Sequence, residues 1–394
     1  MIPRKNGGAL LALALVVMPT TALAGLGLLS GNKQSEPETA PASDEQPLLD
    51  GLRRTGERLG DGLTRTNDEL SEGLDRTFSQ LGDGLRETLA GSGEGLSESL
   101  NRLSEGSAEL GQRLRGRFVE TVEGSEAIEI AVSHQGLGRR VVIVRPETPA
   151  LEPAPAILLL HYAYGTPERM ANLARVSRLA AERGAWIILP EAVNRQWREN
   201  PNGLNLVDDI GFLEKVVAVV TRDYPIDAAR IHLAGMSKGG FMATHMACQS
   251  EFPFAGLALI AAGMRRQQDL QCPLERPLPV IATHGTRDFI VPYDGRLGLL
   301  SANVNFDRWA THNNCDPASE VIAALPPAVD DGTSVTERTN HDCAANSAVQ
   351  LLTIEGGGHT WPGSIPVFGI SLGPTSGNLD ATFAIWDFLE GSAP

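Results

Sequence analysis

The sequence contains 394 residues, of which 42% are hydrophobic and 21% are charged, and its formal net charge is −15 at pH 7. This length can hold two or three domains, and the hydrophobic content is sufficient for a sizeable core. The negative charge argues against nucleic acid or an anionic membrane surface as a partner, because both are themselves negatively charged. These properties fit a soluble protein.

Residues 1–24 have the three parts of a secretory signal peptide. Arg4 and Lys5 form the positive end, an apolar run follows, and Ala22-Leu-Ala24 supplies a small-residue cleavage site. Cleavage would leave no membrane span. An uncleaved anchor is the alternative, because the apolar character continues just beyond the cleavage site. Residues 25–49, which are rich in Pro, Glu and Ser, are expected to be a flexible linker. The sequence therefore predicts a secreted or periplasmic protein.

Residues 50–115 repeat with a period of eleven. An acidic residue followed by Gly-Leu recurs at Asp50, Asp61, Glu72, Asp83 and Glu94. Eleven residues over three helical turns keep the leucines on one slowly drifting face, which favours a right-handed association of helices. A glycine in every repeat costs about 1 kcal/mol relative to alanine, so an isolated helix would be loose. Two interpretations are open, an amphipathic helical stalk that self-associates or lies on an apolar surface, and a partly disordered spacer.

From residue 123 to residue 391 the composition becomes that of an α/β domain. Continuously apolar runs indicate strands that are buried on both faces of a sheet. The expected strands are 139–144, 156–160, 185–189, 231–234, 257–261, 279–283 and 349–354, and the expected helices are 170–183, 208–221 and one that begins near Gly239. Because strands alternate with helices, the sequence predicts a parallel, doubly wound sheet in one catalytic domain.

A G-x-S-x-G motif lies between an expected strand and an expected helix, at Gly235, Ser237 and Gly239. In this context the motif is the nucleophile elbow of α/β-hydrolases. The glycines allow a sharp turn, and the helix N-terminus favours an oxyanion nearby. A simple Gly-Ser turn is the alternative, but the strand-turn-helix setting favours the elbow.

Two later loops supply an acid and a base in the order that such enzymes use. Asp288 follows the strand that ends at Thr283, and His359 follows the strand that ends at Ile354. His359 would take the proton of Ser237, while Asp288 would hold the imidazole in the correct tautomer. The other histidines show no metal-ligand spacing and are interpreted as structural or surface residues. No metal or cofactor is expected.

The same segments resemble the secreted polyhydroxybutyrate depolymerase / feruloyl esterase family of α/β-hydrolases, over roughly two thirds of the chain. The matching stretches are 208–213, 235–240, 284–288, 356–363 and 385–388. The run G-G-G-H-T-W-P-G at 356–363 is the most specific of them. The resemblance implies that Ser237, Asp288 and His359 are the nucleophile, the acid and the base.

One segment departs from the family pattern. Members of the family usually have His-Gly after the apolar strand, where backbone N–H groups complete the oxyanion hole, but residues 161–165 read His-Tyr-Ala-Tyr-Gly. The N–H of Lys238 is expected to be one donor. The second is either the N–H of Ala163 or a hydroxyl group of Tyr162 or Tyr164. The alternative for the tyrosines is a bulky wall residue.

The four cysteines suggest disulfides, since a secreted chain with an even count usually pairs them. Cys248 and Cys272 flank one crossover, and Cys315 and Cys343 flank an insert before the last strand. Proteins of the family that this chain resembles pair cysteines at the same places. Free buried thiols are the alternative.

The sequence thus predicts a secreted serine esterase that hydrolyses carboxylic esters through an acyl-enzyme. The resemblance implies a polyhydroxyalkanoate-type polyester or a feruloylated or acetylated polysaccharide as substrate. Trp197 and Trp361 are candidate substrate-binding residues, with core packing as the alternative. Two other function classes stay open: a surface-structural or binding protein dominated by the repeats, and a serine peptidase.

Overall fold

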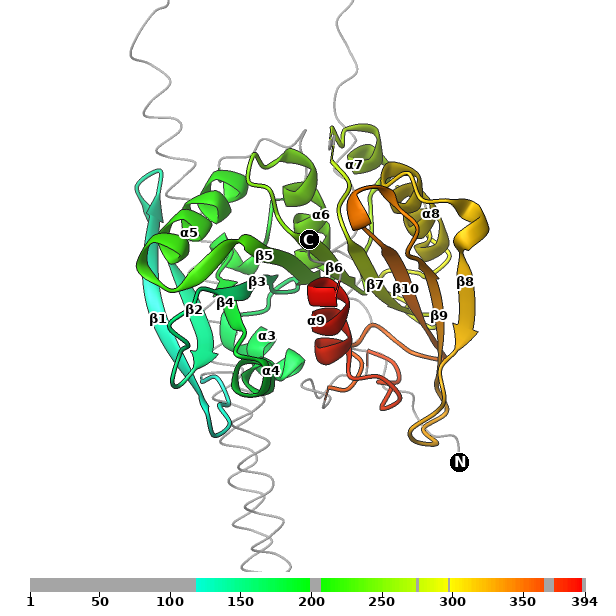
Figure 1. Cartoon of the computed structure of the whole chain (residues 1–394), viewed down its shortest axis with the longest axis horizontal. Coiled ribbons are helices and arrows are strands. Elements are labelled where there is room, and N and C mark those ends of the chain that lie inside the picture. Colours follow the sequence, from blue (N-terminus) through cyan, green and yellow to red (C-terminus); the bar gives the residue numbers. More distant parts are fainter. Residues whose placement is uncertain (1–117, 199–206, 274–275, 297, 365–371, 392–394) are drawn as a thin grey trace, which may run out of the picture. The chain divides into compact units, whose positions relative to one another are not determined.

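The computed structural model describes residues 118–198, 207–273, 276–296, 298–364 and 372–391. The expected signal peptide, linker and repeats, which together span residues 1–115, lie outside these residues. The described residues fold around one large sheet with helices on both of its faces (Figure 1). No helix among them is long and apolar enough to cross a membrane.

The sheet has ten strands in the order β1-β2-β4-β3-β5-β6-β7-β10-β9-β8. They are β1 (Ser125–His134), β2 (Leu137–Pro146), β3 (Ala154–Leu160), β4 (Trp186–Pro190), β5 (Ile226–Met236), β6 (Gly256–Ile260), β7 (Val280–Gly285), β8 (Val321–Ala324), β9 (Ser334–Asn340) and β10 (Val349–Glu355). The central strands run parallel, and they are β4, β3, β5, β6, β7 and β10. Strands β1 and β2 at one end of the sheet, and β9 and β8 at the other, are antiparallel additions. This mostly parallel sheet confirms the expected fold class, and every predicted strand is present.

Two groups of helices cover the sheet. On one face lie α5 (Asp209–Asp223), α6 (Lys238–Gln249) and α8 (Ala302–His312), and on the other lie α3 (Pro167–Ala174), α4 (Val176–Arg183) and α9 (Ala381–Gly391) (Figure 1). The short helices are α7 (Arg266–Leu270), η2 (Val193–Arg195), η3 (Pro317–Ser319) and η4 (Ala344–Asn346). Side chains fix where the longer helices begin: Asp208 accepts from the Gly211 N–H at 2.9 Å, and Ser301 accepts from the Val304 N–H at 3.2 Å.

The helix expected from 170 to 183 is interrupted at Arg175. This residue has φ of 52° and ψ of 40°, in the left-handed region, and its N–H donates to the carbonyl oxygens of Ala171 and Asn172. A left-handed residue ends one helix and redirects the chain. The single periodic segment therefore forms two shorter helices, α3 and α4, and the prediction of one continuous helix is wrong.

The sheet divides the core into two hydrophobic layers. On β3, Leu158 packs in the layer under α5 and α6, while Ile157 and Leu159 pack in the layer under α3, α4 and α9. The residues from 156 to 160 are all buried, as expected for a strand that is covered on both faces. Each such aliphatic side chain contributes about 1.5–3 kcal/mol on burial. Strand β3 is therefore a firm base for the loop that follows it.

Two disulfides are present, with the expected pairing. Cys248–Cys272 links α6 to the segment after α7. Cys315–Cys343 links the segment after α8 to the turn before β10, and so closes the insert that contains β8 and β9.

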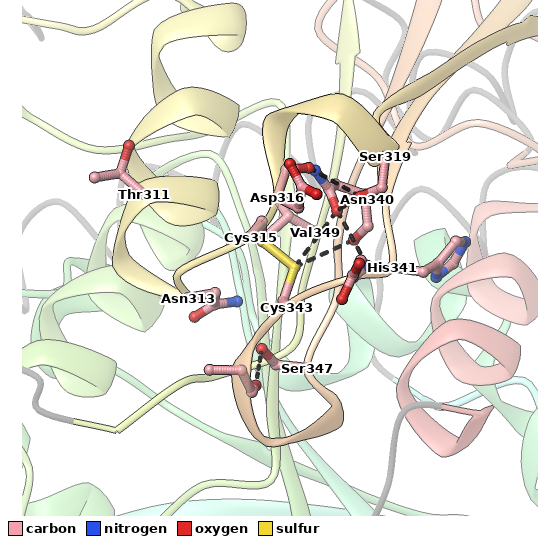
Figure 2. The surroundings of a disulfide bond; sticks show 12 residues. Thr311, Asn313, Cys315, Asp316, Ser319, Asn340, His341, Cys343, Ser347 and Val349 are labelled. Carbon is pink, nitrogen blue, oxygen red and sulfur yellow. Dashed lines mark hydrogen bonds between the residues drawn. A yellow bond between two sulfur atoms is a disulfide. The ribbon is translucent and has the colours of Figure 1, made fainter.

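Figure 2 shows the Cys315–Cys343 bond beside the side chain of Asn340. The amide nitrogen of Asn340 donates to the Asp316 carbonyl oxygen at 2.7 Å, and its amide oxygen accepts from the Ser319 hydroxyl at 2.9 Å. The end of β9 is therefore held to the segment after α8 by hydrogen bonds as well as by the disulfide.

Candidate active site

Ser237 lies at the sharp turn between β5 and α6. Its φ of 53° and ψ of −119° are outside the regions that residues other than glycine normally occupy. Strain of this kind concentrates at functional sites. The backbone N–H of Ser237 donates to the carbonyl oxygen of Ile260 on β6 at 2.9 Å. The turn thus holds the serine at the carboxyl ends of the central strands, as a nucleophile elbow requires.

Close backbone packing requires the glycines of this turn. A Cβ atom on Gly235 would lie 2.3 Å from the carbonyl oxygen of Gly239, and one on Gly239 would lie 2.1 Å from the carbonyl oxygen of Leu160. A Cβ atom on Gly240 would lie 2.4 Å from the Cβ of Ala262. The first turn of α6 can therefore approach the ends of β3 and β5 only because these positions have no side chain.

Asp288 and His359 are joined in the structure. Asp288 follows β7, and His359 follows β10, which is the adjacent parallel strand. Nδ1 of His359 lies 2.7 Å from Oδ2 of Asp288. Because an ionised carboxylate can only accept, the imidazole donates its Nδ1–H. Nε2 of His359 is then the nitrogen that can take a proton from a nucleophile.

The Asp288 carboxylate has partners on both oxygens. Oδ1 accepts from the backbone N–H groups of Ile290 at 2.9 Å and Val291 at 2.8 Å, and Nε2 of His284 lies 3.5 Å from Oδ2. Burial alone would raise the pKa of Asp288, but the hydrogen bonds from His284, His359 and Val291 outweigh burial and hold that pKa well below its usual range. Asp288 is therefore ionised throughout the neutral pH range.

His284 supports the acid from the end of β7. Its Nε2 lies 2.8 Å from the Val291 carbonyl oxygen, and because a carbonyl can only accept, Nε2 carries the proton. The ring meets Tyr293 edge-on, with 5.7 Å between the centroids. His284 is therefore a structural residue, as expected, and its particular role is to orient the loop that contains Asp288.

The glycine run before His359 packs closely against the backbone of neighbouring segments. A Cβ on Gly285 would lie 2.3 Å from the carbonyl oxygen of Gly357. A Cβ on Gly358 would lie 2.4 Å from the Cα of Gly373. The glycine run therefore lets His359 approach the end of β7, where Asp288 begins its own loop.

The segment after β3 forms a tight turn against the elbow. The Gly165 N–H donates to the Tyr162 carbonyl oxygen at 3.0 Å, and Tyr164 inside the turn has a φ of 62°. A Cβ on Gly239 would lie 2.6 Å from the carbonyl oxygen of His161, so the residue immediately before the turn touches the start of α6. The 162–165 turn is therefore a direct neighbour of the Ser237 turn.

Two backbone N–H groups near this contact fit the role of oxyanion donors. Lys238 opens α6 directly after Ser237, and in α/β-hydrolases the backbone N–H of the residue after the nucleophile is one of the oxyanion donors. Ala163 lies inside the 162–165 turn. Tyr162 differs, because its ring packs in the layer under α3 and α4 and the residue is 8% exposed. Burial also raises the pKa of Tyr162. This packing favours the alternative of a wall residue, and the role of the Tyr162 hydroxyl group as a donor stays a prediction.

His161 holds the turn from beneath. Its Nε2 accepts from the Ala192 N–H at 3.1 Å, so Nδ1 carries the proton and donates to the Tyr162 carbonyl oxygen at 2.7 Å. Burial, together with the positive charges of Arg139 and Arg195, lowers the pKa of His161 to about 4. His161 is therefore a neutral imidazole of fixed tautomer that connects two loops of the site.

Trp197 and Trp361 are not placed to bind substrate. Trp197 is 0% exposed, and its indole N–H donates to the His161 carbonyl oxygen at 2.9 Å. Trp361 is 3% exposed, and its indole N–H donates to the Thr382 hydroxyl at 3.0 Å. A ring without an exposed face cannot stack on a substrate, so the expectation of substrate platforms is wrong. Core packing is the correct interpretation.

A buried ion pair, which the sequence patterns did not indicate, joins Arg139 on β2 to Asp209 at the start of α5. NH1 of Arg139 lies 2.7 Å from Oδ1 of Asp209, and both side chains are almost fully buried. The Arg139 guanidinium also lies 3.5 Å from the centroid of the Phe212 ring and 5.6 Å from that of Trp197. An arginine inside an otherwise apolar strand was the available signal, because a buried charge requires a partner.

Comparison with known proteins adds independent information. Residues 207–314 match the family described as Phospholipase/Carboxylesterase. The chain is 28% identical over 266 residues to the putative esterase NocK of Nocardia uniformis subsp. tsuyamanensis, covering 62% of this chain and 77% of that protein. It is 26% identical over 221 residues to feruloyl esterase B of Piromyces equi, covering 52% of this chain and 39% of that protein. Among solved structures, an acetyl xylan esterase from Aspergillus awamori shares 14% sequence identity, with a TM-score of 0.45 over 60% of this chain and 94% of that one.

The mostly parallel sheet and the turn at Ser237 define the class of fold: the described residues have an α/β-hydrolase fold, and the family matched by residues 207–314 supports this class. Within that class it is a carboxylic ester hydrolase, as its matched family and its esterase relatives indicate. The chain spans less than half the length of feruloyl esterase B, so the substrate is a separate question.

Proposed function

We propose that this hydrolase is a serine esterase in which Ser237 is the nucleophile, His359 the general base and Asp288 the acid that orients it. The observation that carries the proposal is the 2.7 Å contact between His359 and Asp288. It forms at the same edge of the sheet as the strained turn at Ser237. The order of the three residues along the chain also agrees with that of α/β-hydrolases.

In the first half-reaction, Oγ of Ser237 attacks the ester carbonyl carbon while its proton passes to Nε2 of His359. The N–H groups of Lys238 and Ala163 stabilise the oxyanion that forms. The bond to the alcohol then breaks, His359 gives its proton to the leaving alkoxide, and the acyl group stays on Ser237. In the second half-reaction water attacks the acyl carbon while His359 takes a proton from it. The bond from the acyl carbon to Oγ of Ser237 then breaks, His359 returns the proton to Oγ, and a carboxylic acid is released.

The variant Ser237→Ala tests this mechanism with a p-nitrophenyl ester as substrate. We expect turnover to fall at least about 10³-fold, because only the oxyanion and binding contributions remain. Ser133→Ala is the matched control, since Ser133 is exposed on β1 and should leave turnover unchanged. Retention of more than about a tenth of the wild-type rate by Ser237→Ala would refute the assignment.

For the substrate, we favour an acylated polysaccharide over a polyhydroxyalkanoate-type polyester. The support is that relatives of this chain are named feruloyl esterase B and bifunctional acetylxylan esterase/xylanase. A panel of feruloylated xylan, acetylated xylan and hydroxybutyrate oligomers separates the two classes. Release of ferulate or acetate would support an acylated polysaccharide as the substrate. Preferential release of hydroxybutyrate would identify the polyester as the substrate instead.

We also propose that the protein is secreted or periplasmic. The signal-like residues 1–24 support this location. So do the disulfides Cys248–Cys272 and Cys315–Cys343, which persist in oxidising compartments. N-terminal sequencing of the mature protein should begin at Gly25, and a mature protein that retains Met1 would contradict the cleavage.

The repeats at 50–115 are proposed to set the oligomeric state or the attachment to a surface rather than to act in catalysis. Their apolar stripe is too narrow to form a core alone. Deletion of 50–115 should leave turnover of a small ester unchanged and lower the mass in solution or the surface binding. A folded deletion variant with collapsed turnover would place the repeats in the active site instead.

A further inference from the structure

Two exposed aromatic side chains adjoin residues of the candidate active site. Tyr164 is 53% exposed and Phe289 is 55% exposed, whereas aromatic residues elsewhere in the described ranges are mostly buried or half-buried. Tyr164 follows Ala163, the proposed oxyanion donor, and Phe289 follows Asp288, the proposed acid. Exposed aromatic rings are costly in water, so a pair at one site needs a reason.

Tyr164 is held outward by a strained backbone. Its φ is 62°, a conformation that glycine adopts at no steric cost. Its N–H donates to the carbonyl oxygen of Arg195 at 2.9 Å, and Arg195 and Asn194 themselves have φ values of 55° and 53°. One hydrogen bond thus joins the strained residue Tyr164 to a second loop that is itself strained. Strain that is kept at such a position is a sign of function.

Phe289 is exposed although its loop is firmly held. The two residues after it, Ile290 and Val291, donate their backbone N–H groups to Asp288. Val291 is buried, and both side chains pack with Phe241 in a small apolar cluster beside α6. The chain on both sides of Phe289 is therefore anchored, so the exposure of Phe289 does not come from a loose loop.

The sheet order places the two rings on opposite sides of the nucleophile. Tyr164 follows β3, Ser237 follows β5 and Phe289 follows β7, in a sheet that runs β3-β5-β6-β7. All of these strands are parallel, so the segments after them share one edge. Neighbouring strands are about 4.8 Å apart, which puts roughly 14 Å between β3 and β7. That span suits an acyl group of several carbons lying across the serine.

We propose that Tyr164 and Phe289 are specificity-determining residues that hold the apolar acyl group of the ester, as an aliphatic chain or as an aryl group. This inference rests on the proposed serine esterase function. It gives the two rings the substrate-binding role that the sequence suggested for Trp197 and Trp361. An acyl group as small as acetyl would reach Ser237 without contacting either ring. The rings should therefore favour esters with larger acyl groups over acetate esters.

The test compares p-nitrophenyl acetate, butyrate and octanoate and a cinnamate ester with the full chain. In Tyr164→Ala and in Phe289→Ala, the ratio of kcat/KM for octanoate or cinnamate to that for acetate should fall about tenfold, mainly through KM. Tyr164→Phe keeps the ring, so its ratio should equal that of the wild type. Leu151→Ala is the control, because Leu151 is 98% exposed and lies before β3, at the far edge of the sheet.

Tyr164→Gly separates specificity from structure. Glycine relieves the positive φ, so its melting temperature should be no lower than that of the wild type, while the acyl preference falls as in Tyr164→Ala. An unchanged acyl ratio in the folded double variant of Tyr164→Ala and Phe289→Ala would overturn the inference. So would a loss of acetate turnover in Tyr164→Phe, because it would make the hydroxyl group an oxyanion donor. A wild-type protein that hydrolyses none of the esters would instead refute the proposed function itself.

Discussion

The carboxylate of Asp288 binds His359 through one oxygen while its other oxygen is held by the backbone of its own loop. Oδ2 lies 2.7 Å from Nδ1 of His359, and Oδ1 accepts the N–H groups of Ile290 and Val291. The loop thus fixes which oxygen faces the imidazole. Because each oxygen has its own partners, replacing the carboxylate of Asp288 with an amide of the same shape should have a defined effect on the tautomer of His359.

In Asp288→Asn, the amide oxygen should stay with the two backbone N–H groups, because only oxygen can accept them. The amide nitrogen would then face His359 and force its proton onto Nε2, the wrong tautomer for a general base. We expect kcat to fall about 10³–10⁴-fold with little change in KM. Asp227→Asn, a change at the opposite end of β5, should leave both constants unchanged. A fall of less than tenfold would contradict the assigned role of Asp288.

Gly239→Ala should both destabilise and inactivate the protein. The new Cβ would lie 2.1 Å from the carbonyl oxygen of Leu160, so α6 must move away from β3 and carry Ser237 with it. We expect a loss of about 1–3 kcal/mol of unfolding free energy and at least a tenfold loss of kcat. Urea unfolding and initial rates measure the two effects.

Gly391→Ala is the matched control for this change. A Cβ at Gly391, the last residue of α9, meets no atom within 4 Å, so stability and activity should stay within error of the wild type. Equal behaviour of Gly239→Ala and Gly391→Ala would show that the close approach at the elbow is not needed.

The sequence allowed the elbow and the central strands to be predicted, because both depend on local patterns. Gly235, Ser237 and Gly239 form a short motif whose spacing follows from one turn. A run such as 156–160 is apolar at every position because both faces of β3 are covered. The order of Asp288 and His359 then follows from the order of the strands.

Other features depend on contacts between distant segments and could not be predicted in this way. Strand β9 reads Ser-Val-Thr-Glu-Arg-Thr-Asn, and it is extended because it pairs with β10. Trp197 is buried because it lies under the turn after β3 and beside Arg139, contacts that no periodicity reports. The break between α3 and α4 at Arg175 could not be predicted either, because arginine rarely adopts the left-handed conformation that ends α3.

Loss of Cys315–Cys343 should reduce stability without affecting catalysis. The bond closes a loop with a sequence separation of 28 residues, and such closure contributes about 3 kcal/mol by limiting the unfolded chain. Its neighbour Asn313 binds the backbone of Leu278, before β7 begins, at the edge of the sheet opposite the catalytic loops. The double variant Cys315→Ser with Cys343→Ser should therefore unfold at lower urea and keep the wild-type kcat. A large loss of kcat in the folded variant would contradict this separation.

Protonation of His161 should weaken the fold in mild acid. The folded-state pKa is about 4, below the ordinary value of 6.5, because burial disfavours the charged imidazole. Between these two values the unfolded chain binds a proton that the folded protein does not bind. Stability therefore falls as pH is lowered through this window, by on the order of 3 kcal/mol in total. The contribution of His161 is complete above pH 6.5.

The variant His161→Asn tests this assignment by urea unfolding at pH values from 4.5 to 7. It removes the titrating group, so the slope of unfolding free energy against pH should decrease by up to about 1.4 kcal/mol per pH unit. The variant should also lose kcat, because the 162–165 turn loses the bond that fixes Ala163 as a donor. His341→Asn, at an exposed position, should change neither property. If His161→Asn keeps the wild-type slope, the acid sensitivity arises elsewhere and His161 is not the group that titrates.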